Sequence, residues 1–395
     1  MPARLGDRSL FPDLEPFSYC GHAAISPPSL PVRRRVEEAL FDHARQGHGA
    51  YGPWRERREL LRGRLGALLG AAADDVAFVP STTRGIGDVA LGIPWQRGDR
   101  VLLFRGEFPT NITPWQCAAE AHGLELCWLE AGAFDAGDGL ELLERELRRG
   151  VRLVAVSAVQ FQTGLAMPLE AMGRACRNHG AELFVDAIQA LGVLPVDVET
   201  CQVDYLSSGS HKWLMGAGGC GFLYVRKGCA ERLRPVTAGW QSHERGAEFL
   251  NSGPDALRYD RPLLRSARVF ESSSPFLLAC AALEASVELI AELGVPAIHN
   301  HVQAWHDALQ PALVQRGFVS LRSREPKARS GILSFRPPEP HSAPEIRQRL
   351  QGLGITCSAP DGVLRFAPHW PNSLAEVPRV VECVDQALSS RSVRQ

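Results

Sequence analysis

Residues 207–228 read SSGSHKWLMGAGGCGFLYVRKG, and they carry two patterns that predict different cofactors. Gly216, Gly218 and Gly221 match the G-x-G-x-x-G pattern of a dinucleotide site. That fingerprint needs a helix after its glycines, because the helix N-terminus holds the pyrophosphate. Here FLYVR follows, a β-branched and aromatic run that predicts a strand. We therefore interpret the glycine match as accidental and assign the chemistry to Lys212, with a nicotinamide-dependent oxidoreductase as the alternative that the glycines leave open.

Helix and strand patterns alternate from residue 31 to about residue 226. Such alternation is typical of an α/β fold in which helices cover a mostly parallel sheet. Residues 236–266 break the alternation with Gly, Pro and polar residues, and they predict a long loop that we expect to contact the substrate. The predicted strands lie at 76–80, 100–104, 124–130, 151–159, 181–189 and 220–226, with helical segments between them.

The remaining chain predicts a second, smaller unit. A length of 395 residues exceeds the usual size of a single hydrophobic core. We expect a large domain over residues 25–275, and an N-terminal arm (1–24) that accompanies a small α+β C-terminal domain (276–395). The elements predicted in that smaller unit are a long apolar helix at 275–294, strands at 331–337 and 362–368, and helices at 344–354 and 374–388.

The composition excludes several classes of partner. Lys and Arg number 43 against 44 Asp and Glu, with no basic block, so we expect neither nucleic acid nor a membrane as a partner. The N-terminus carries charges and prolines, and no apolar run is long enough to span a bilayer, which favours a cytoplasmic protein. The ten cysteines show no C-x-x-C pair and no Cys/His ligand spacing, so neither disulfides nor a metal site are expected. A small neutral or zwitterionic ligand is the expected partner.

Three features together indicate pyridoxal 5'-phosphate. Asp186 ends an apolar strand, at the edge where an open α/β sheet binds ligands. Thr82 and Thr83 open a helix whose free N–H groups suit a phosphate. Taken alone, Asp186 could be a turn residue and the threonines an N-cap. A lysine that can form a Schiff base, a carboxylate for the pyridine nitrogen and a phosphate site in one chain nevertheless predict this cofactor.

From GHAAISP (21–27) to GVLRFAPHWPNS (362–373), the chain resembles the class V aminotransferase group of fold-type I pyridoxal phosphate enzymes. That group includes cysteine desulfurases, selenocysteine lyases, isopenicillin N epimerases and kynureninases. The most specific part is SGSHKWLMGAGGCGFLYVRKG, in which Lys212 matches the Schiff-base lysine. The resemblance implies an α/β large domain, with a mostly parallel seven-stranded sheet flanked by helices, and a small α+β C-terminal domain.

The resemblance also implies a set of cofactor contacts. Asp186 would pair with the pyridinium nitrogen, and Gln189 would hydrogen-bond the ring hydroxyl. Phe108, in RGEFPTNITPW, would stack on the cofactor ring. A phenyl group can stack there, but it cannot move a proton. The phosphate would be bound by Thr82, Thr83, Ser208, Ser210 and His211.

Substrate and subunit contacts are implied by the same resemblance. Arg365 matches the arginine that binds the substrate α-carboxylate, a role that suits a planar guanidinium, with a surface salt bridge as the alternative. Gln160, in SAVQFQTG, lies where the family places a side chain beside the cofactor. Ser274 matches a hydroxyl residue that reaches the neighbouring subunit's phosphate, so a homodimer is implied.

The expected reaction begins when Lys212 removes the Cα proton of an α-amino acid and the cofactor stabilises the carbanion. Lyase, epimerase and aminotransferase chemistry can all follow from that carbanion. A cysteine desulfurase or selenocysteine lyase would use Cys357 as its nucleophile, but this thiol lies only eight residues before Arg365 and continues a predicted strand, which favours a buried thiol. A catalytically inactive scaffold that binds the cofactor is the non-enzyme alternative. The joint presence of Lys212, Asp186 and Arg365 favours the enzyme.

Overall fold

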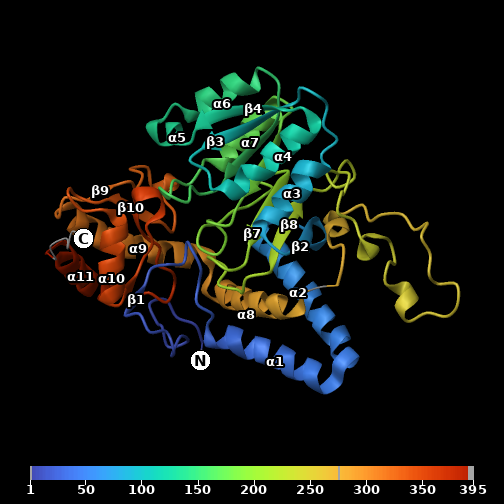
Figure 1. Cartoon of the computed structure of the whole chain (residues 1–395), viewed down its shortest axis with the longest axis horizontal. Coiled ribbons are helices and arrows are strands. Elements are labelled where there is room, and N and C mark those ends of the chain that lie inside the picture. The colour runs from blue at the N-terminus through green and yellow to red at the C-terminus, as the bar shows by residue number, and fades with distance from the viewer. Residues whose placement is uncertain (1, 275, 390–395) are drawn as a thin grey trace, which may run out of the picture.

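The computed structural model describes residues 2–274 and 276–389, and a seven-stranded sheet lies at its centre (Figure 1). Its strands are β2 (Val76–Val79), β3 (Arg100–Arg105), β4 (Glu125–Glu130), β5 (Val151–Ser157), β6 (Glu182–Asp186), β7 (Tyr205–Gly209) and β8 (Gly221–Val225). Their order across the sheet is β2-β8-β7-β6-β5-β3-β4. The strands from β3 to β7 pair in parallel, whereas β8 is antiparallel to both β2 and β7. The predicted mostly parallel, seven-stranded α/β sheet is confirmed.

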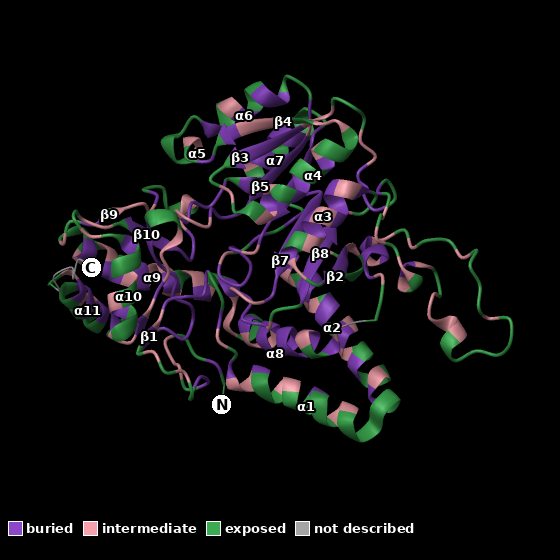
Figure 2. Cartoon of the chain, viewed as in Figure 1, coloured by how far each residue is buried: buried purple, intermediate pink, exposed green. Residues whose placement is uncertain are grey.

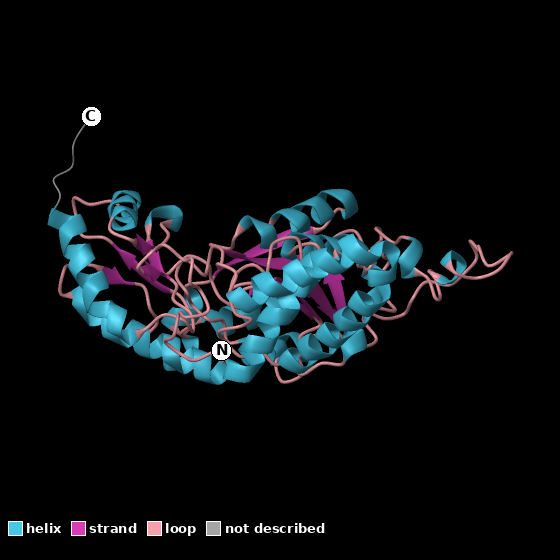
Figure 3. Ribbon diagram, turned by 90° about the horizontal axis from the view of Figure 1, so that it is seen from below, coloured by secondary structure: helices cyan, strands magenta, loops and turns pink. Residues whose placement is uncertain are grey.

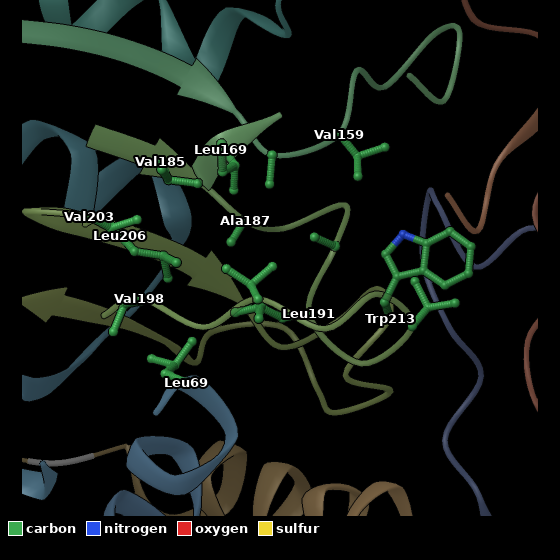
Figure 4. Close-up of a cluster of buried hydrophobic side chains, with 14 of the residues drawn as sticks. Leu69, Val159, Leu169, Val185, Ala187, Leu191, Val198, Val203, Leu206 and Trp213 are labelled. Carbon is green, nitrogen blue, oxygen red and sulfur yellow. The ribbon is translucent and has the colours of Figure 1, made fainter. Parts of the chain in front are cut away.

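Helices cover both faces of this sheet because its strands alternate between two hydrophobic clusters. Leu102 and Phe104 of β3 pack in one cluster, with α2 (Tyr51–Leu69), α6 (Gly139–Leu147) and α7 (Leu169–Asn178). Val101 and Leu103 point the other way, into a cluster with α3 (Thr82–Gly92) and α4 (Thr113–His122). Figure 2 shows the buried strands between these layers, and Figure 4 shows part of the first cluster. The short helix α5 (Ala133–Ala136) lies beyond β4.

Three long helices pack together at one side of the sheet (Figure 1). α1 (Leu30–Gln46) has Pro31 in its first turn, where the missing N–H costs no hydrogen bond. α2 ends at Gly70, whose φ of 72° is a left-handed conformation that suits glycine. α8 (Leu277–Leu293) packs against both α1 and α2, and so lies against the elements of the large sheet.

A second core is formed by the C-terminal part of the chain. β9 (Val319–Ser320), β10 (Leu333–Arg336) and β12 (Leu364–Phe366) form an antiparallel sheet in the order β12-β10-β9. They pack on α9 (Val295–Val314), α10 (Ala343–Gly352) and α11 (Val377–Ser389) through their own hydrophobic cluster. The N-terminal strand β1 (Ser18–Tyr19) pairs in parallel with β11 (Ile355–Thr356), so the arm joins the C-terminal unit. Figure 3 shows the two sheets apart from one another. The boundaries at 24/25 and 275/276 stay predictions.

The short elements β1, β9 and α5 went unpredicted, and so did two longer ones. β7 has the sequence YLSSG, whose serines hide the strand pattern, and α9 contains Pro311. The predicted loop at 236–266 contains only short 3₁₀ turns and projects away from the rest of the chain (Figure 1, Figure 3). Within residues 2–274 and 276–389, none of the helices combines the length and the apolar character that a membrane span requires.

Candidate active site

A cavity of about 400 Å³ lies at the carboxyl ends of β5 and β6, next to the first turn of α3. Ser157 and Asp186 end these two strands and are partners in the register of the sheet. The small C-terminal unit closes the cavity from the other side, through Pro360 and Arg365. This is the edge at which open α/β sheets bind ligands. The predicted site residues that line it are Thr82, Thr83, Phe108, Asp186, Gln189, His211, Lys212 and Arg365.

Lys212 and Asp186 shift each other's pKa inside this cavity. Burial lowers the pKa of Lys212 to about 8, while the charge of Asp186 opposes this shift and that of Arg365 adds to it. Burial raises the pKa of Asp186 to about 6, against the backbone N–H of Ile188, which donates to Oδ1 over 3.0 Å, and against the charge of Lys212. The Lys212 amine therefore loses its proton at a lower pH than an ordinary lysine does, which favours its use as a general base.

The first turn of α3 fits a phosphate group. Ser81 caps the helix through Oγ, which accepts from the backbone N–H of Arg84 over 3.2 Å. The Thr82 Oγ1 atom is buried and has no hydrogen-bond partner within the described residues, although buried hydroxyls normally have one. A Cβ atom at Gly209 would lie 3.2 Å from this oxygen, so glycine there leaves room beside it. The unsatisfied hydroxyl and the free N–H groups of the helix together suit the phosphate of pyridoxal phosphate.

Arg365 is a buried cation without a carboxylate partner in the described part of the chain. It is 4% exposed, and its guanidinium donates to the Phe161 carbonyl over 2.5 Å and to the Ser358 hydroxyl over 2.9 Å. Burial lowers its pKa to about 10. Because an unpaired buried charge is costly, the arrangement suits a carboxylate that arrives with the substrate.

Four predicted site residues do not line the cavity. The hydroxyl of Ser208 donates to the Gly209 carbonyl over 3.2 Å, and that of Ser210 donates to the carbonyls of Ala217 and Cys220. Gln160 lines a neighbouring cavity and donates to Glu107 over 3.1 Å. Ser274 is exposed beside a separate hollow. Their predicted roles in cofactor and substrate binding are therefore left without support from this geometry.

Gln189 lines the cavity, but its amide already has partners. Nε2 donates to the Ala23 carbonyl over 3.0 Å, and Oε1 accepts from the Trp213 indole over 2.8 Å. The second hydrogen on Nε2 is the one that could bond to the hydroxyl of the cofactor ring. These two bonds also fix Trp213, the residue after Lys212.

The sequence did not single out Phe161, Ser157 or Glu107. The Phe161 ring meets Phe108 edge to face, with centroids 5.3 Å apart, and Phe108 in turn lies 5.5 Å from the Lys212 Nζ atom. Glu107 accepts from the backbone N–H of Ser157 over 2.7 Å and from its hydroxyl. Burial and the neighbouring Asp186 raise the Glu107 pKa to about 7. The sequence offered one indication of Glu107, namely its position in the chain next to Phe108, a predicted site residue.

Cys357 lies in the hydrophobic cluster of the small unit and does not line the cavity. It is 7% exposed, and burial raises its pKa to about 12. The strand after the glycines is also present, since β8 begins at Gly221. The helix that a dinucleotide fingerprint would need is therefore replaced by a strand, as the sequence predicts.

The fold and this site define a fold-type I pyridoxal phosphate enzyme. A family profile described as Aminotransferase class-V matches residues 42–362. The chain therefore belongs to the aminotransferase class-V family. It is an enzyme that acts on a small-molecule substrate, and pyridoxal 5'-phosphate is its cofactor.

Curated relatives cover nearly all of the chain. The Bacillus subtilis protein named uncharacterized aminotransferase YcbU is 27% identical over 382 residues, 95% of each chain. Isopenicillin N epimerase of Streptomyces clavuligerus is 26% identical, over 84% of this chain and 83% of its own. Among solved structures, a cysteine desulfurase from Thermococcus onnurineus has a TM-score of 0.82 at 24% identity, covering 93% of this chain and 94% of its own. Similarity at that level shows a shared fold.

Proposed function

We propose that this protein is a pyridoxal-phosphate-dependent lyase, which removes the Cα proton and a Cβ substituent from an α-amino acid. One observation carries the proposal: the Lys212 Nζ atom lies 5.5 Å from the centroid of the Phe108 ring, which meets the Phe161 ring edge to face, and both rings line the cavity. Phenyl rings cannot deliver a proton, so these two side chains do not supply the second acid that inversion at Cα would need. This geometry disfavours an epimerase.

The absence of a thiol from the cavity lining disfavours sulfur transfer through the enzyme. Of the described residues that line the cavity, none is a cysteine. The nucleophile proposed for a desulfurase, Cys357, is buried in a different core and keeps its proton up to a high pH. Elimination needs no nucleophile from the protein, because Lys212 alone removes the proton and the Cβ substituent leaves with its bonding electrons. A cystine C–S lyase has the same fold, with a TM-score of 0.85 over 93% of this chain and 97% of its own.

The side chains divide the remaining tasks among themselves. Bound pyridoxal phosphate supplies the electron-withdrawing ring that acidifies the Cα proton. The first turn of α3, with Thr82, would hold the phosphate, and Asp186 would keep the pyridine nitrogen protonated. Arg365 would bind the α-carboxylate and so orient the Cα–H bond toward Lys212. Phe108 would stack on the ring of the bound cofactor.

Product analysis with purified enzyme tests the proposal. We expect S-substituted cysteines to give a keto acid, ammonia and a thiol with no added keto acid, because the released enamine hydrolyses in water. Lys212→Ala should abolish turnover, whereas Arg347→Gln, on α10, should not change it. Turnover that requires an added keto acid as the amino-group acceptor would instead show an aminotransferase. Accumulation of the D-amino acid would show an epimerase.

We also propose that the enzyme is a cytoplasmic homodimer in which Ser274 approaches the partner's cofactor. All ten cysteines are free, which suits a reducing compartment. Apolar side chains on the projecting segment 236–266 are exposed: Val236 at 57%, Leu250 at 55% and Tyr259 at 90%. Of these three, Leu250 borders a hollow of about 610 Å³, together with Trp240 and Phe249, and Ser274 lines the same hollow. Exposed apolar surface of this kind is typical of an interface.

Light scattering of the purified protein tests the assembly. We expect the mass of a dimer, and we expect Leu250→Asp to shift the equilibrium toward monomer. Val319→Asp is the matched control, because Val319 is equally exposed, at 56%, but lies on β9 of the small sheet. A wild-type monomer at working concentrations would contradict this part of the proposal.

A further inference from the structure

The turn after β3 carries Phe108 into the catalytic cavity, although the ring is not enclosed by a hydrophobic core. Phe108 lines the cavity and is 46% exposed. Its ring meets the edge of Phe161, with the centroids 5.3 Å apart. Because packing leaves this side chain half exposed, its position depends on the backbone that carries it.

Glu107, the residue before Phe108, ties this turn to the neighbouring strand. Its Oε1 atom accepts from the backbone N–H of Ser157 over 2.7 Å and from Nε2 of Gln160 over 3.1 Å. Its Oε2 atom accepts from the Ser157 hydroxyl. Hydrogen bonds to an ionised carboxylate are stronger than those between neutral groups. One side chain therefore fastens the turn to the end of β5.

These hydrogen bonds form where the sheet itself no longer joins β3 and β5. The pairing of the two strands stops three residues before the end of each. Ala158 donates its N–H to the Asp186 carbonyl in β6 over 2.8 Å, so the preceding N–H, that of Ser157, points to the opposite side, toward β3. The Glu107 carboxylate takes the place of the missing strand partner there.

The other end of the turn is anchored to α3. The hydroxyls of Thr110 and Thr83 are hydrogen-bonded over 3.0 Å, and the N–H of Asn111 donates to the Phe108 carbonyl over 2.9 Å. Phe108 thus lies between one anchor on β5 and another on the helix whose first turn fits a phosphate. Glu107 lines neither the catalytic cavity nor the neighbouring one, so any effect on the cofactor must pass through the residues that it holds.

We propose that Glu107 is a positioning residue, which fixes the Phe108 ring where it stacks on the pyridine ring of pyridoxal phosphate. A side chain that is already in place does not have to be ordered when the ligand binds, so affinity for the cofactor should depend on Glu107. This inference rests on the proposed function in one respect, since it assumes that Phe108 stacks on the cofactor.

Titration of the apo-protein with pyridoxal phosphate tests the inference, with visible absorbance and induced circular dichroism as readouts. At pH 8, above the Glu107 pKa of about 7, the carboxylate is ionised. We expect Glu107→Ala to bind the cofactor about tenfold more weakly and to lose most of the dichroism of the bound cofactor. Glu107→Gln keeps an oxygen for the Ser157 N–H and should stay within about threefold of the wild type.

Glu130→Ala is the matched control, because Glu130 ends the adjacent strand β4 opposite Arg105 and pairs with it over 3.4 Å. It should bind the cofactor like the wild type. Glu107→Asp, whose carboxylate is one methylene shorter, replaces Glu107→Ala if the alanine variant does not fold, with the same expected loss. Equal affinity of Glu107→Ala and the wild type, or a Glu107→Gln variant as weak as Glu107→Ala, would overturn the positioning role.

A double-mutant cycle with Phe108→Ala shows whether Glu107 acts through this ring. Phe108→Ala alone should weaken cofactor binding, and in that background Glu107→Ala should weaken it by less than about twofold more. Additive losses would overturn the inference and leave the stacking role of Phe108 intact. Unchanged affinity in Phe108→Ala would contradict both the stacking and the inference. No amino acid is added, so none of these results depends on the lyase reaction.

Discussion

The imidazole of His369 donates its Nε2–H to the carbonyl of Trp213, the residue after Lys212, over 2.8 Å. The direction follows from the other nitrogen, since Nδ1 accepts from the backbone N–H of Trp370 over 2.7 Å. On the other side, the Ser26 hydroxyl donates to the Lys212 carbonyl over 2.6 Å and accepts from the His22 ring over 2.7 Å. Two buried histidines therefore hold the two consecutive carbonyls that position the catalytic lysine.

Removal of the His369 donor should displace the lysine segment. His369→Leu leaves two buried backbone groups unpaired, which costs about 1–3 kcal/mol for each. We expect it to lower stability and to slow the recombination of apo-protein with pyridoxal phosphate about tenfold. His369→Gln retains a donor at the Nε2 position and should stay within about threefold of the wild type. Denaturant unfolding and stopped-flow absorbance measure both effects. Equal rates for Leu and Gln would contradict the positioning role.

The same histidine should make stability depend on pH. Burial lowers the His369 pKa from 6.5 to about 4, so the unfolded chain binds this proton below pH 6.5 and the folded protein only below about 4. The stability is therefore complete above pH 6.5 and falls as the pH drops toward 4. At pH 5 the loss from this group is about 2 kcal/mol. Urea unfolding at pH 7 and pH 5 should show a smaller difference for His369→Gln than for the wild type, and an identical difference would exclude His369 as a source.

A substitution of Thr82 should weaken cofactor binding without lowering the stability of the apo-protein. Its buried hydroxyl lacks a partner among the described residues, so Thr82→Val removes an unsatisfied group of similar shape. We expect apo-protein stability to stay equal or rise by up to about 1 kcal/mol. Affinity for pyridoxal phosphate should nevertheless fall about tenfold, since a charge-assisted hydrogen bond is lost. Thr163→Val, outside the catalytic cavity, is the control for cofactor affinity. A loss of apo-protein stability with unchanged affinity would assign Thr82 a structural role.

Local sequence patterns predicted much of the fold and part of the site. Asp186 and Thr82 were identifiable because each stands where an apolar strand or a helical pattern begins or ends. Side-chain direction along irregular segments was not identifiable. Gln160, predicted beside the cofactor, lines the neighbouring cavity, whereas the next residue, Phe161, lines the catalytic one. Phe161 begins a turn, and the directions of side chains in a turn do not follow a simple sequence period.

The serines show a second limit of the sequence. Ser207, Ser208 and Ser210 present the same hydroxyl, but strand pairing and the turn after β7 decide which carbonyl each one meets. Gly221 serves close packing instead, since a Cβ there would lie 2.4 Å from the Ser208 carbonyl oxygen. Such contacts form between segments that are brought together only by the tertiary fold.

Cys357 should be dispensable for chemistry. It lies in a hydrophobic core, so Cys357→Ala should cost about 1–2 kcal/mol of stability through lost packing. Release of sulfur from cysteine or its S-substituted derivatives should stay within about twofold of the wild type, because a difference below 0.5 kcal/mol changes a rate by little more. Cys117→Ala, at an exposed thiol, is the control. Complete loss of sulfur release in Cys357→Ala alone would restore the desulfurase alternative.

The charges around Lys212 should set its protonation in the apo-protein. Asp186 raises the pKa of Lys212 and Arg365 lowers it, around a value near 8 that burial determines. Asp186→Asn should therefore shift the Lys212 pKa below 8, and Arg365→Gln should shift it above 8, while Arg347→Gln should leave it unchanged. The rate of Lys212 acylation as a function of pH, followed by peptide mass spectrometry, reports this pKa because only the neutral amine reacts. Shifts of the same sign in both variants would mean that solvent entry, rather than the two charges, controls the amine.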